Sequence, residues 1–233
     1  MQIAILAGGL GTRLGPLTRD RPKSLVDVQG RPFLAWQLDL LRRHGVTDVV
    51  LCVGHLAEAI ERHFGDGSAF GVRLRYSDEG GRRLGTAGAL TWAAGLLGEV
   101  FFVLFGDSYL LLDYRAILEH FLARDRLALM VVHRNANRWD RSDVAVDGDC
   151  VTAYAAGPTP GMIHINAGLS VLRHAALDAL APGQPASLQD FYARLIPRRQ
   201  LLAYEARQRF YEVGSPAGLE EFRRLVAEGG VPR

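Results

Sequence analysis

Apolar runs alternate with helix-like segments along the first half of this chain of 233 residues, and this rhythm limits the folds open to it. The runs at 2–7, 48–55, 72–77 and 100–107 read as strands, and the last of them is apolar on both faces. Continuous apolar strands separated by helices indicate a parallel sheet that is covered on both sides.

The second half keeps both kinds of element but loses the regular alternation. Strands are predicted at 128–134, 162–173 and 207–214, and a hairpin over 144–154 turns at Asp147-Gly148. Helices are predicted at 33–45, 57–64, 86–97, 115–124, 188–196 and 216–228. The expected fold class is α/β, with a Rossmann-like, mixed and mostly parallel sheet that has helices on both faces.

Composition and charge exclude several classes of function. The net charge of +2 and the dispersed arginine pairs give no case for nucleic-acid binding. No apolar run reaches the length of a membrane span, and the opening residues lack the pattern of a signal peptide. Cys52 and Cys150 lie in strand-like stretches and read as buried thiols in a reducing compartment, so we expect a cytoplasmic protein.

A glycine-rich loop follows the first strand. Gly8, Gly9 and Gly11 lie where the ligands of open α/β sheets bind, and glycines let backbone N–H groups curl around an anion. The loop matches neither familiar phosphate motif. Leu14 stands where the dinucleotide fingerprint needs glycine, and Lys23 follows proline where the Walker A motif has glycine. The failed fingerprint disfavours an NAD-dependent oxidoreductase.

The chain has 27 lysine and arginine residues, and Lys23 is the only lysine among them. A lysine ammonium is a compact point charge, whereas an arginine is a planar fork suited to bidentate contact. Lys23 therefore fits a narrow space between two phosphate groups, and Arg13 fits the terminal phosphates of a polyphosphate.

Five landmarks connect these residues to a known family. The stretch LAGGLGTRLGPLTRDRPKSL at 6–25 is followed by LGTAGAL (84–90), FGD (105–107), INAG (165–168) and YEVGSP (211–216). Their order resembles that of the sugar-1-phosphate nucleotidyltransferases, or NDP-sugar pyrophosphorylases, and the chain is most similar in style to the small heptose- or mannose-1-phosphate guanylyltransferases.

The resemblance implies an enzyme that joins a nucleoside triphosphate to a sugar 1-phosphate, releasing pyrophosphate and forming an NDP-sugar. It implies one nucleotidyltransferase domain over 1–233, with a nucleotide-binding half at about 1–113 and a sugar-binding half at about 114–233. Arg13, Lys23 and Asp107 would be catalytic. The nucleotide would contact Leu6, Ala7, Gly8, Gly9, Gly11, Thr12, Arg13, Glu79, Gly85 and Thr86.

A magnesium ion is the expected cofactor. Asp107 ends the most apolar predicted strand, and Mg²⁺ commonly takes one or two carboxylates together with phosphates and water. The family has a second acid in a late Asp-x-Gly segment, which here is Glu212-Val213-Gly214. Asp107 and Glu212 are therefore the implied metal ligands.

Weaker sequence signals indicate which nucleobase and which sugar the enzyme would bind. The carboxylate of Glu79 suits the paired N–H donors of guanine, which favours GTP over UTP. Asn166, Gly168 and Asp190 match positions that would contact the sugar. With GTP the acceptor would be a heptose or mannose 1-phosphate. A uridylyltransferase for an amino sugar 1-phosphate is the alternative enzyme.

One departure from the family keeps a different class of function open. Many relatives carry a second lysine after the hairpin, where this chain has Tyr154-Ala155-Ala156-Gly157-Pro158. Either an arginine replaces it, or acceptor binding is weak, or the chain is a non-catalytic nucleotide-sugar-binding regulatory protein. The sequence also leaves open whether the chain forms a homo-oligomer.

Overall fold

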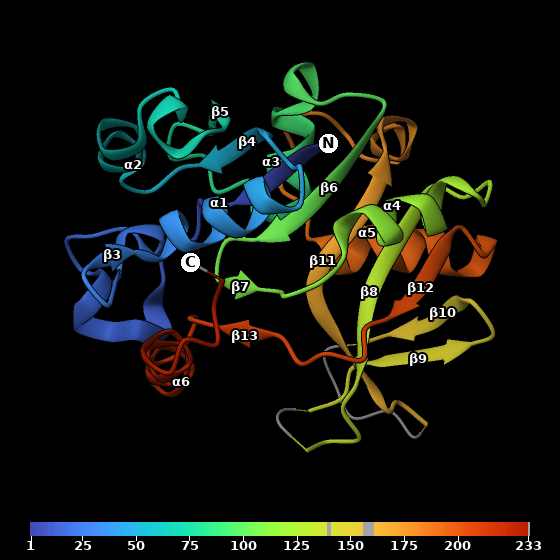
Figure 1. Ribbon diagram of the computed structural model, residues 1–233. Helices are drawn as coiled ribbons and strands as arrows, with labels where there is room; N and C mark the ends of the chain where they lie inside the picture. The colour runs from blue at the N-terminus through green and yellow to red at the C-terminus, as the bar shows by residue number, and fades with distance from the viewer. Residues whose placement is uncertain (139–140, 156–160, 233) are drawn as a thin grey trace. The chain divides into compact units, whose positions relative to one another are not determined.

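The computed structural model describes residues 1–138, 141–155 and 161–232, and Figure 1 draws the course of the chain. The chain divides into two compact units. The first contains Met1–Arg83, Leu104–Leu111 and Phe210–Arg233, and the second contains Leu84–Val103 and Leu112–Arg209. Each unit takes segments from both sides of the boundary expected near residue 113, and the single domain over 1–233 stays a prediction.

The first unit contains the parallel strands that the sequence predicts. β1 (Gln2–Leu6), β4 (Asp48–Val53) and β5 (Arg73–Asp78) are parallel and lie in the order β5-β4-β1. In their register Ile5 lies opposite Leu51, and Leu51 lies opposite Tyr76. The glycine-rich loop leaves β1 at its carboxyl end.

Three α-helices belong to the first unit: α1 (Phe33–Arg43), α2 (Ala57–Phe64) and α6 (Pro216–Ala227). Its 3₁₀ segments are η1 (Thr12–Thr18), η2 (Lys23–Leu25) and η3 (Ser68–Phe70). Helix α6 begins as its sequence predicts, because the side chain of Ser215 accepts a hydrogen bond from the Gly218 N–H and Pro216 occupies the first helical turn.

Two short antiparallel ladders complete the first unit. One joins β2 (Asp27–Val28) to β3 (Arg31–Pro32), and the other joins β7 (Ser108–Tyr109) to β13 (Tyr211–Glu212), which are drawn side by side in Figure 1. The second ladder is anchored in a buried cluster between α1 and α6. Tyr109 and Val213 are buried in that cluster, and the rings of Phe33 and Phe222 meet edge to face at 5.2 Å.

The second unit contains β6 (Val100–Phe105, whose last two residues belong to the first unit), β8 (Ala128–Arg134), β9 (Val144–Asp147), β10 (Cys150–Tyr154), β11 (His164–Arg173) and β12 (Leu201–Glu205). Their order is β6-β11-β8-β12-β10-β9. Strand β9 also pairs with β11, where His164 lies opposite Val144, so five strands form a closed circuit of pairings.

The pairing in this circuit is mainly antiparallel. Only β8 and β12 run parallel, while β11–β8, β12–β10, β10–β9 and β9–β11 are antiparallel among the described residues. The α/β class and the mixed strand pairing agree with the sequence prediction. The predicted mostly parallel character of the sheet, however, is found in the first unit and not in this circuit. The predicted hairpin at 144–154 is confirmed as β9 and β10, with Gly148 at φ 59° in its turn.

One predicted strand is wrong over most of its length. Of the expected strand at 207–214, only Tyr211–Glu212 lie in a ladder, and β12 at Leu201–Glu205 is a strand that the pattern does not predict. β12 is a short buried run, which periodicity alone does not separate from other apolar segments.

The helical segments of the second unit are α3 (Gly85–Trp92), α4 (Tyr114–Leu122), α5 (Leu188–Leu195), η4 (Ala94–Leu96), η5 (His174–Ala179) and η6 (Ile196–Arg198).

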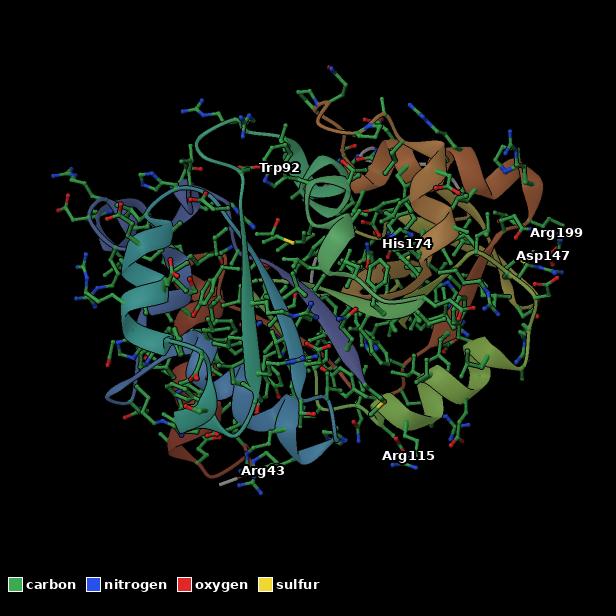
Figure 2. All side chains as sticks on the ribbon, turned by 90° about the horizontal axis from the view of Figure 1, so that it is seen from above. Arg43, Trp92, Arg115, Asp147, His174 and Arg199 are labelled. Atoms are coloured by element: carbon green, nitrogen blue, oxygen red, sulfur yellow. The ribbon has the colours of Figure 1, made fainter. Side chains whose placement is uncertain are left out.

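The arginines are dispersed over separate elements of the chain. Arg43 on α1, Arg115 on α4 and Arg199 after η6 are all exposed and are labelled in Figure 2. None of the helices in the described ranges combines the length and apolar character needed to cross a membrane.

Candidate functional site

The glycine-rich loop is tied to its surroundings at both of its ends. Before the glycines, the Ala7 N–H donates to the Cys52 carbonyl at 2.8 Å. After them, the Gly11 carbonyl accepts the Thr18 hydroxyl at 2.9 Å, and Gly11 has a φ of 65° that disfavours any residue with a side chain. Gly9, between these ends, is exposed, and a methyl group there would meet nothing within 4 Å. The loop is therefore anchored at its ends and open at its centre.

Lys23 and Asp107 form an ion pair in the first unit. The ammonium Nζ of Lys23 donates to Oδ2 of Asp107 at 2.7 Å, and their side chains are 18% and 13% exposed. Gly106 brings the acid to this place, because its N–H donates to the Leu6 carbonyl at 3.0 Å and a Cβ there would lie 2.5 Å from that oxygen. The end of β1 and the acid are thus held together through a position that only glycine fits.

Arg13 contacts both of the acids that are predicted to hold the metal. Its guanidinium lies 3.6 Å from Asp107 and 3.7 Å from Glu212. The β7–β13 ladder brings the acids together, because Glu212 lies opposite Ser108 and the Val213 N–H donates to the Asp107 carbonyl at 2.8 Å. Four predicted site residues, Arg13, Lys23, Asp107 and Glu212, therefore form one chain of alternating charges.

Gly214 makes room for this group. A Cβ on Gly214 would lie 2.7 Å from Nη2 of Arg13 and 2.7 Å from Oδ2 of Asp107. Real Cβ atoms essentially never come so close, so a side chain at this position would displace the guanidinium of Arg13, the carboxylate of Asp107 or both. Gly214 is in the sequence motif, but its role in admitting both side chains is visible only in the structure.

Glu79 lies against the same loop and is more buried than an acid in a glycine-rich segment suggests. It is 9% exposed, and a Cβ on Gly54 or Gly8 would lie 2.8 Å or 3.5 Å from its Oε1. Burial, together with the negative charge of Glu79, raises the pKa of the Cys52 thiol to about 12. The carboxylate of Glu79 is therefore packed on the backbone beside Gly8, and its contact with a base remains a prediction.

Gly85 and Thr86 lie in the second unit and pack against the segment before α5. Gly85 has a φ of 72°, and a Cβ on it would lie 2.7 Å from the Ala186 carbonyl. The hydroxyl of Thr86 accepts the Leu188 N–H at 2.7 Å. The segment that contains Ala186 thus lies directly against Gly85, and the contact of Gly85 and Thr86 with a nucleotide remains a prediction.

The residues predicted to contact the sugar also lie in the second unit. Asn166 accepts the Gly168 N–H at 2.9 Å and donates to the hydroxyl of Tyr154 at 3.3 Å, which fixes its carboxamide. Asp190 belongs to the start of α5, where its carboxylate accepts the Ser187 hydroxyl at 2.7 Å. Asp190 thus has a local capping contact of its own. Of the stretch that lacks the second lysine, Ala156-Gly157-Pro158 lie outside the described residues.

The acids of the site form a pair rather than a larger cluster. Within the described ranges, no three His, Cys, Asp or Glu side chains come together as a ready metal site. Asp107 and Glu212 meet at Arg13, whose positive charge lies within 4 Å of both carboxylates. Two oxygen donors of this kind are the usual protein contribution to a Mg²⁺ site that is completed by phosphates.

Comparison with known proteins connects this arrangement to a family. The family described as nucleotidyl transferase matches residues 3–139. The N-acetylmuramate alpha-1-phosphate uridylyltransferase of Neisseria meningitidis serogroup B is 30% identical over 233 residues, which cover 97% of this chain and 98% of that protein. The D-glycero-alpha-D-manno-heptose 1-phosphate guanylyltransferase of Campylobacter jejuni is 28% identical over 224 residues, which cover 95% and 98%.

A solved structure supports the same assignment. The crystal structure of HddC from Yersinia pseudotuberculosis complexed with GMP-PN has a TM-score of 0.81 at 25% identity, and the match covers 97% of this chain and 99% of that one. The resemblance inferred from the five motifs is confirmed. The chain belongs to the nucleotidyl transferase family, and its relatives include sugar-1-phosphate nucleotidyltransferases.

Proposed function

We propose that this protein transfers a nucleoside monophosphate from a nucleoside triphosphate to a sugar 1-phosphate. The observation that carries the proposal is the Lys23–Asp107 pair, held at 2.7 Å beside the end of β1 with Arg13 and Glu212 next to it. The first substrates to test are GTP with a heptose or mannose 1-phosphate, because the relative from Campylobacter jejuni is a heptose 1-phosphate guanylyltransferase and a relative from Xenopus laevis is a mannose-1-phosphate guanyltransferase. UTP with an amino sugar 1-phosphate is the second candidate, favoured by the 30% identical relative from Neisseria meningitidis.

In the proposed reaction, an oxygen of the sugar phosphate attacks the α-phosphorus of the nucleotide. A new P–O bond forms there, the bond to the β-phosphate breaks, and pyrophosphate leaves with the electron pair of that bond. The protein's part in such transfers is positioning and stabilisation of charge. Arg13, 64% exposed and close to the loop, would hold the β- and γ-phosphates. Lys23 would neutralise the charge that builds up as the two phosphates approach.

Asp107 and Glu212 would hold a magnesium ion in this reaction. The two carboxylates fit a hard divalent cation, since the guanidinium of Arg13 already lies within 4 Å of an oxygen of each. When bound, the ion supplies positive charge at the transferring phosphate. Arg13 and Lys23 would then exchange their carboxylate contacts for contacts with phosphate oxygens.

The first unit, with its parallel strands and anchored loop, would be the Rossmann-like part that holds the triphosphate. The further contacts that the family resemblance implies are those of Gly85 and Thr86 with the nucleotide and those of Asn166, Gly168 and Asp190 with the sugar. The free thiols of Cys52 and Cys150, both buried, support a reducing compartment such as the cytoplasm.

A pyrophosphate-release assay tests the proposal. The parental chain is incubated with Mg²⁺, each of GTP, UTP, CTP, ATP and dTTP in turn, and a panel of hexose, heptose and amino sugar 1-phosphates. Release that needs both a nucleotide and a sugar phosphate supports the transfer, and the NDP-sugar is identified by mass spectrometry. Tight nucleotide-sugar binding without release from any pair would favour the regulatory alternative instead.

Replacing Gly214 by alanine should impair turnover without unfolding the first unit. The new methyl group would displace the guanidinium of Arg13 or the carboxylate of Asp107, and small displacements of catalytic groups can cost about a hundredfold in rate. We expect kcat to fall by about ten- to a hundredfold, measured as steady-state pyrophosphate release. Gly95→Ala is the matched control, because a Cβ at Gly95 meets nothing within 4 Å. Unchanged kcat in Gly214→Ala would show that the close packing at this glycine is dispensable.

Replacing Glu79 by glutamine tests the reading of the base. A carboxylate accepts two hydrogen bonds where an amide offers one acceptor, and guanine presents two adjacent donors. A lost hydrogen bond to a charged group costs about 1.5–3 kcal/mol, so binding of GTP should weaken by about ten- to a hundredfold and binding of UTP by less. Isothermal titration with each nucleotide measures the difference. Equal weakening of both nucleotides would place base recognition elsewhere and leave Glu79 as a support for the loop.

A further inference from the structure

Helix α1 carries one buried polar side chain on an otherwise apolar inner face. Its buried residues are Phe33, Leu34, Ala35, Trp36, Gln37, Leu38, Leu40 and Leu41. Gln37 is 2% exposed, and its Nε2 donates to the Ser108 carbonyl at 2.8 Å. Its Oε1 is buried and has no hydrogen-bond partner among the described residues.

An apolar side chain of similar length would fill the same volume without this unsatisfied oxygen. Burying an amide with one half unpaired costs stability, because that half loses its hydrogen bonds to water. What Gln37 offers here, and a leucine or methionine would not, is the N–H that it donates to the Ser108 carbonyl. Buried polar groups of this kind call for an explanation beyond packing.

The bond reaches the segment that carries both acids of the site. Ser108 directly follows Asp107 and lies opposite Glu212 in the β7–β13 ladder. The Val213 N–H closes the same turn by donating to the Asp107 carbonyl at 2.8 Å. A constraint on the Ser108 carbonyl from α1 thus limits where the backbone can place Asp107 and, through the ladder, Glu212.

We infer that Gln37 is a positioning residue for the Asp107–Glu212 pair. Its amide holds the Ser108 carbonyl from the side of α1, so that both carboxylates keep the separation at which Arg13 reaches each of them. Gln37 contacts no substrate in this role. The catalytic part of the inference rests on the proposed function, whereas the effect on the ladder does not.

Two substitutions separate the hydrogen bond from the volume that Gln37 fills. Gln37→Met keeps the length of the side chain and removes the donor. Gln37→Glu keeps the shape, and its side chain can donate to Ser108 only when protonated. Leu41→Met is the control, one helical turn further along the same buried face and without a side-chain hydrogen bond.

The expected effect of Gln37→Met is on kcat. Removing the partner of a metal-binding segment typically costs about 10- to 100-fold in activity or metal affinity, and kcat should fall in that range while KM for the sugar phosphate stays unchanged. In Gln37→Glu, kcat relative to the parental chain should rise as the pH falls, because a protonated carboxyl regains the donor. Leu41→Met should keep the parental kcat at every pH.

Hydrogen exchange at the Val213 amide gives a readout that needs no turnover. Exchange should be faster in Gln37→Met than in the parental chain and unchanged in Leu41→Met, because only the former releases the turn at Ser108. If the parental chain releases no pyrophosphate, the proposed function fails and this exchange rate alone decides on Gln37.

Two results would overturn the inference. One is parental kcat together with parental Val213 exchange in Gln37→Met. The other is an equal loss in Gln37→Met and Gln37→Glu at all pH values, which would make the position a matter of packing. If Gln37→Met fails to fold, the pH dependence of Gln37→Glu still decides, since that variant keeps the native shape.

Discussion

Asp107→Asn should lower pyrophosphate release by about a thousandfold or more while the fold is retained. The amide keeps the shape of the side chain but removes the charge that pairs with Lys23 at 2.7 Å and that would hold the metal. A metal ion supplies several kcal/mol of charge stabilisation in such transfers, and about 4 kcal/mol corresponds to a factor of a thousand in rate. Single-turnover release under saturating Mg-NTP measures the loss, and circular dichroism checks the fold.

Asp39→Asn is the matched control for Asp107→Asn. Asp39 also forms an ion pair in the first unit, with Arg31 at 2.8 Å, but it has no contact with the loop residues or with Asp107 among the interactions described here. Its loss should leave release unchanged. Parental activity in Asp107→Asn would remove this acid from the site, and equal losses in both variants would point to a general effect of the lost charge.

Lys23→Arg should be nearly as damaging as Lys23→Ala, with kcat falling by about a hundred- to a thousandfold. The side chain of Lys23 is only 18% exposed, and its ammonium lies 2.7 Å from Oδ2 of Asp107. A guanidinium keeps the charge but is wider and planar, so it does not fit the same confined place. The loss should appear in kcat rather than KM, because the contact strengthens as the two phosphates approach in the transition state.

Single-turnover rates of the Arg, Ala and Met variants at Lys23 give the decisive comparison. Arg73→Lys provides the reverse exchange at an ordinary pair, because Arg73 is 67% exposed and contacts Asp48 at 2.9 Å. That change should leave kcat unaffected, as expected for an exposed ion pair. An arginine variant at position 23 that turns over like the parental chain would show that any positive charge suffices and that the single lysine is an accident of composition.

The longer strands and the helices of the first unit follow from local patterns, and so their prediction succeeds, whereas its short ladders do not. β1 and β4 are apolar runs bounded by loops, and α6 begins with Ser215-Pro216, a pair typical of a helix start. In the second unit, by contrast, local sequence patterns do not indicate which strand pairs with which. His164 lies opposite Val144 through a pairing that neither segment indicates alone, so the closed circuit of five strands is a result of tertiary structure.

The site shows the same division between local and distant information. The motifs predict Arg13, Lys23, Asp107 and Glu212, and the structure brings these four together. Gln37 escapes notice in the sequence because a glutamine in an amphipathic helix is usually solvated, and its burial depends on the distant segment at Ser108. The burial of Glu79 against Gly8 and Gly54 likewise depends on three loops that meet only in the folded unit.

The three-segment construction of the first unit imposes an order on events during translation. A ribosome releases Phe33 and Trp36 long before Phe222, whose ring meets that of Phe33 in the folded unit. Every residue of the second unit precedes Phe210, so that unit can assemble while the aromatic face of α1 still lacks its partner. Glu212 emerges with the same late segment. A nascent chain therefore lacks one of the two proposed metal ligands until 210–233 leaves the ribosome, and we expect unfinished chains to be inactive.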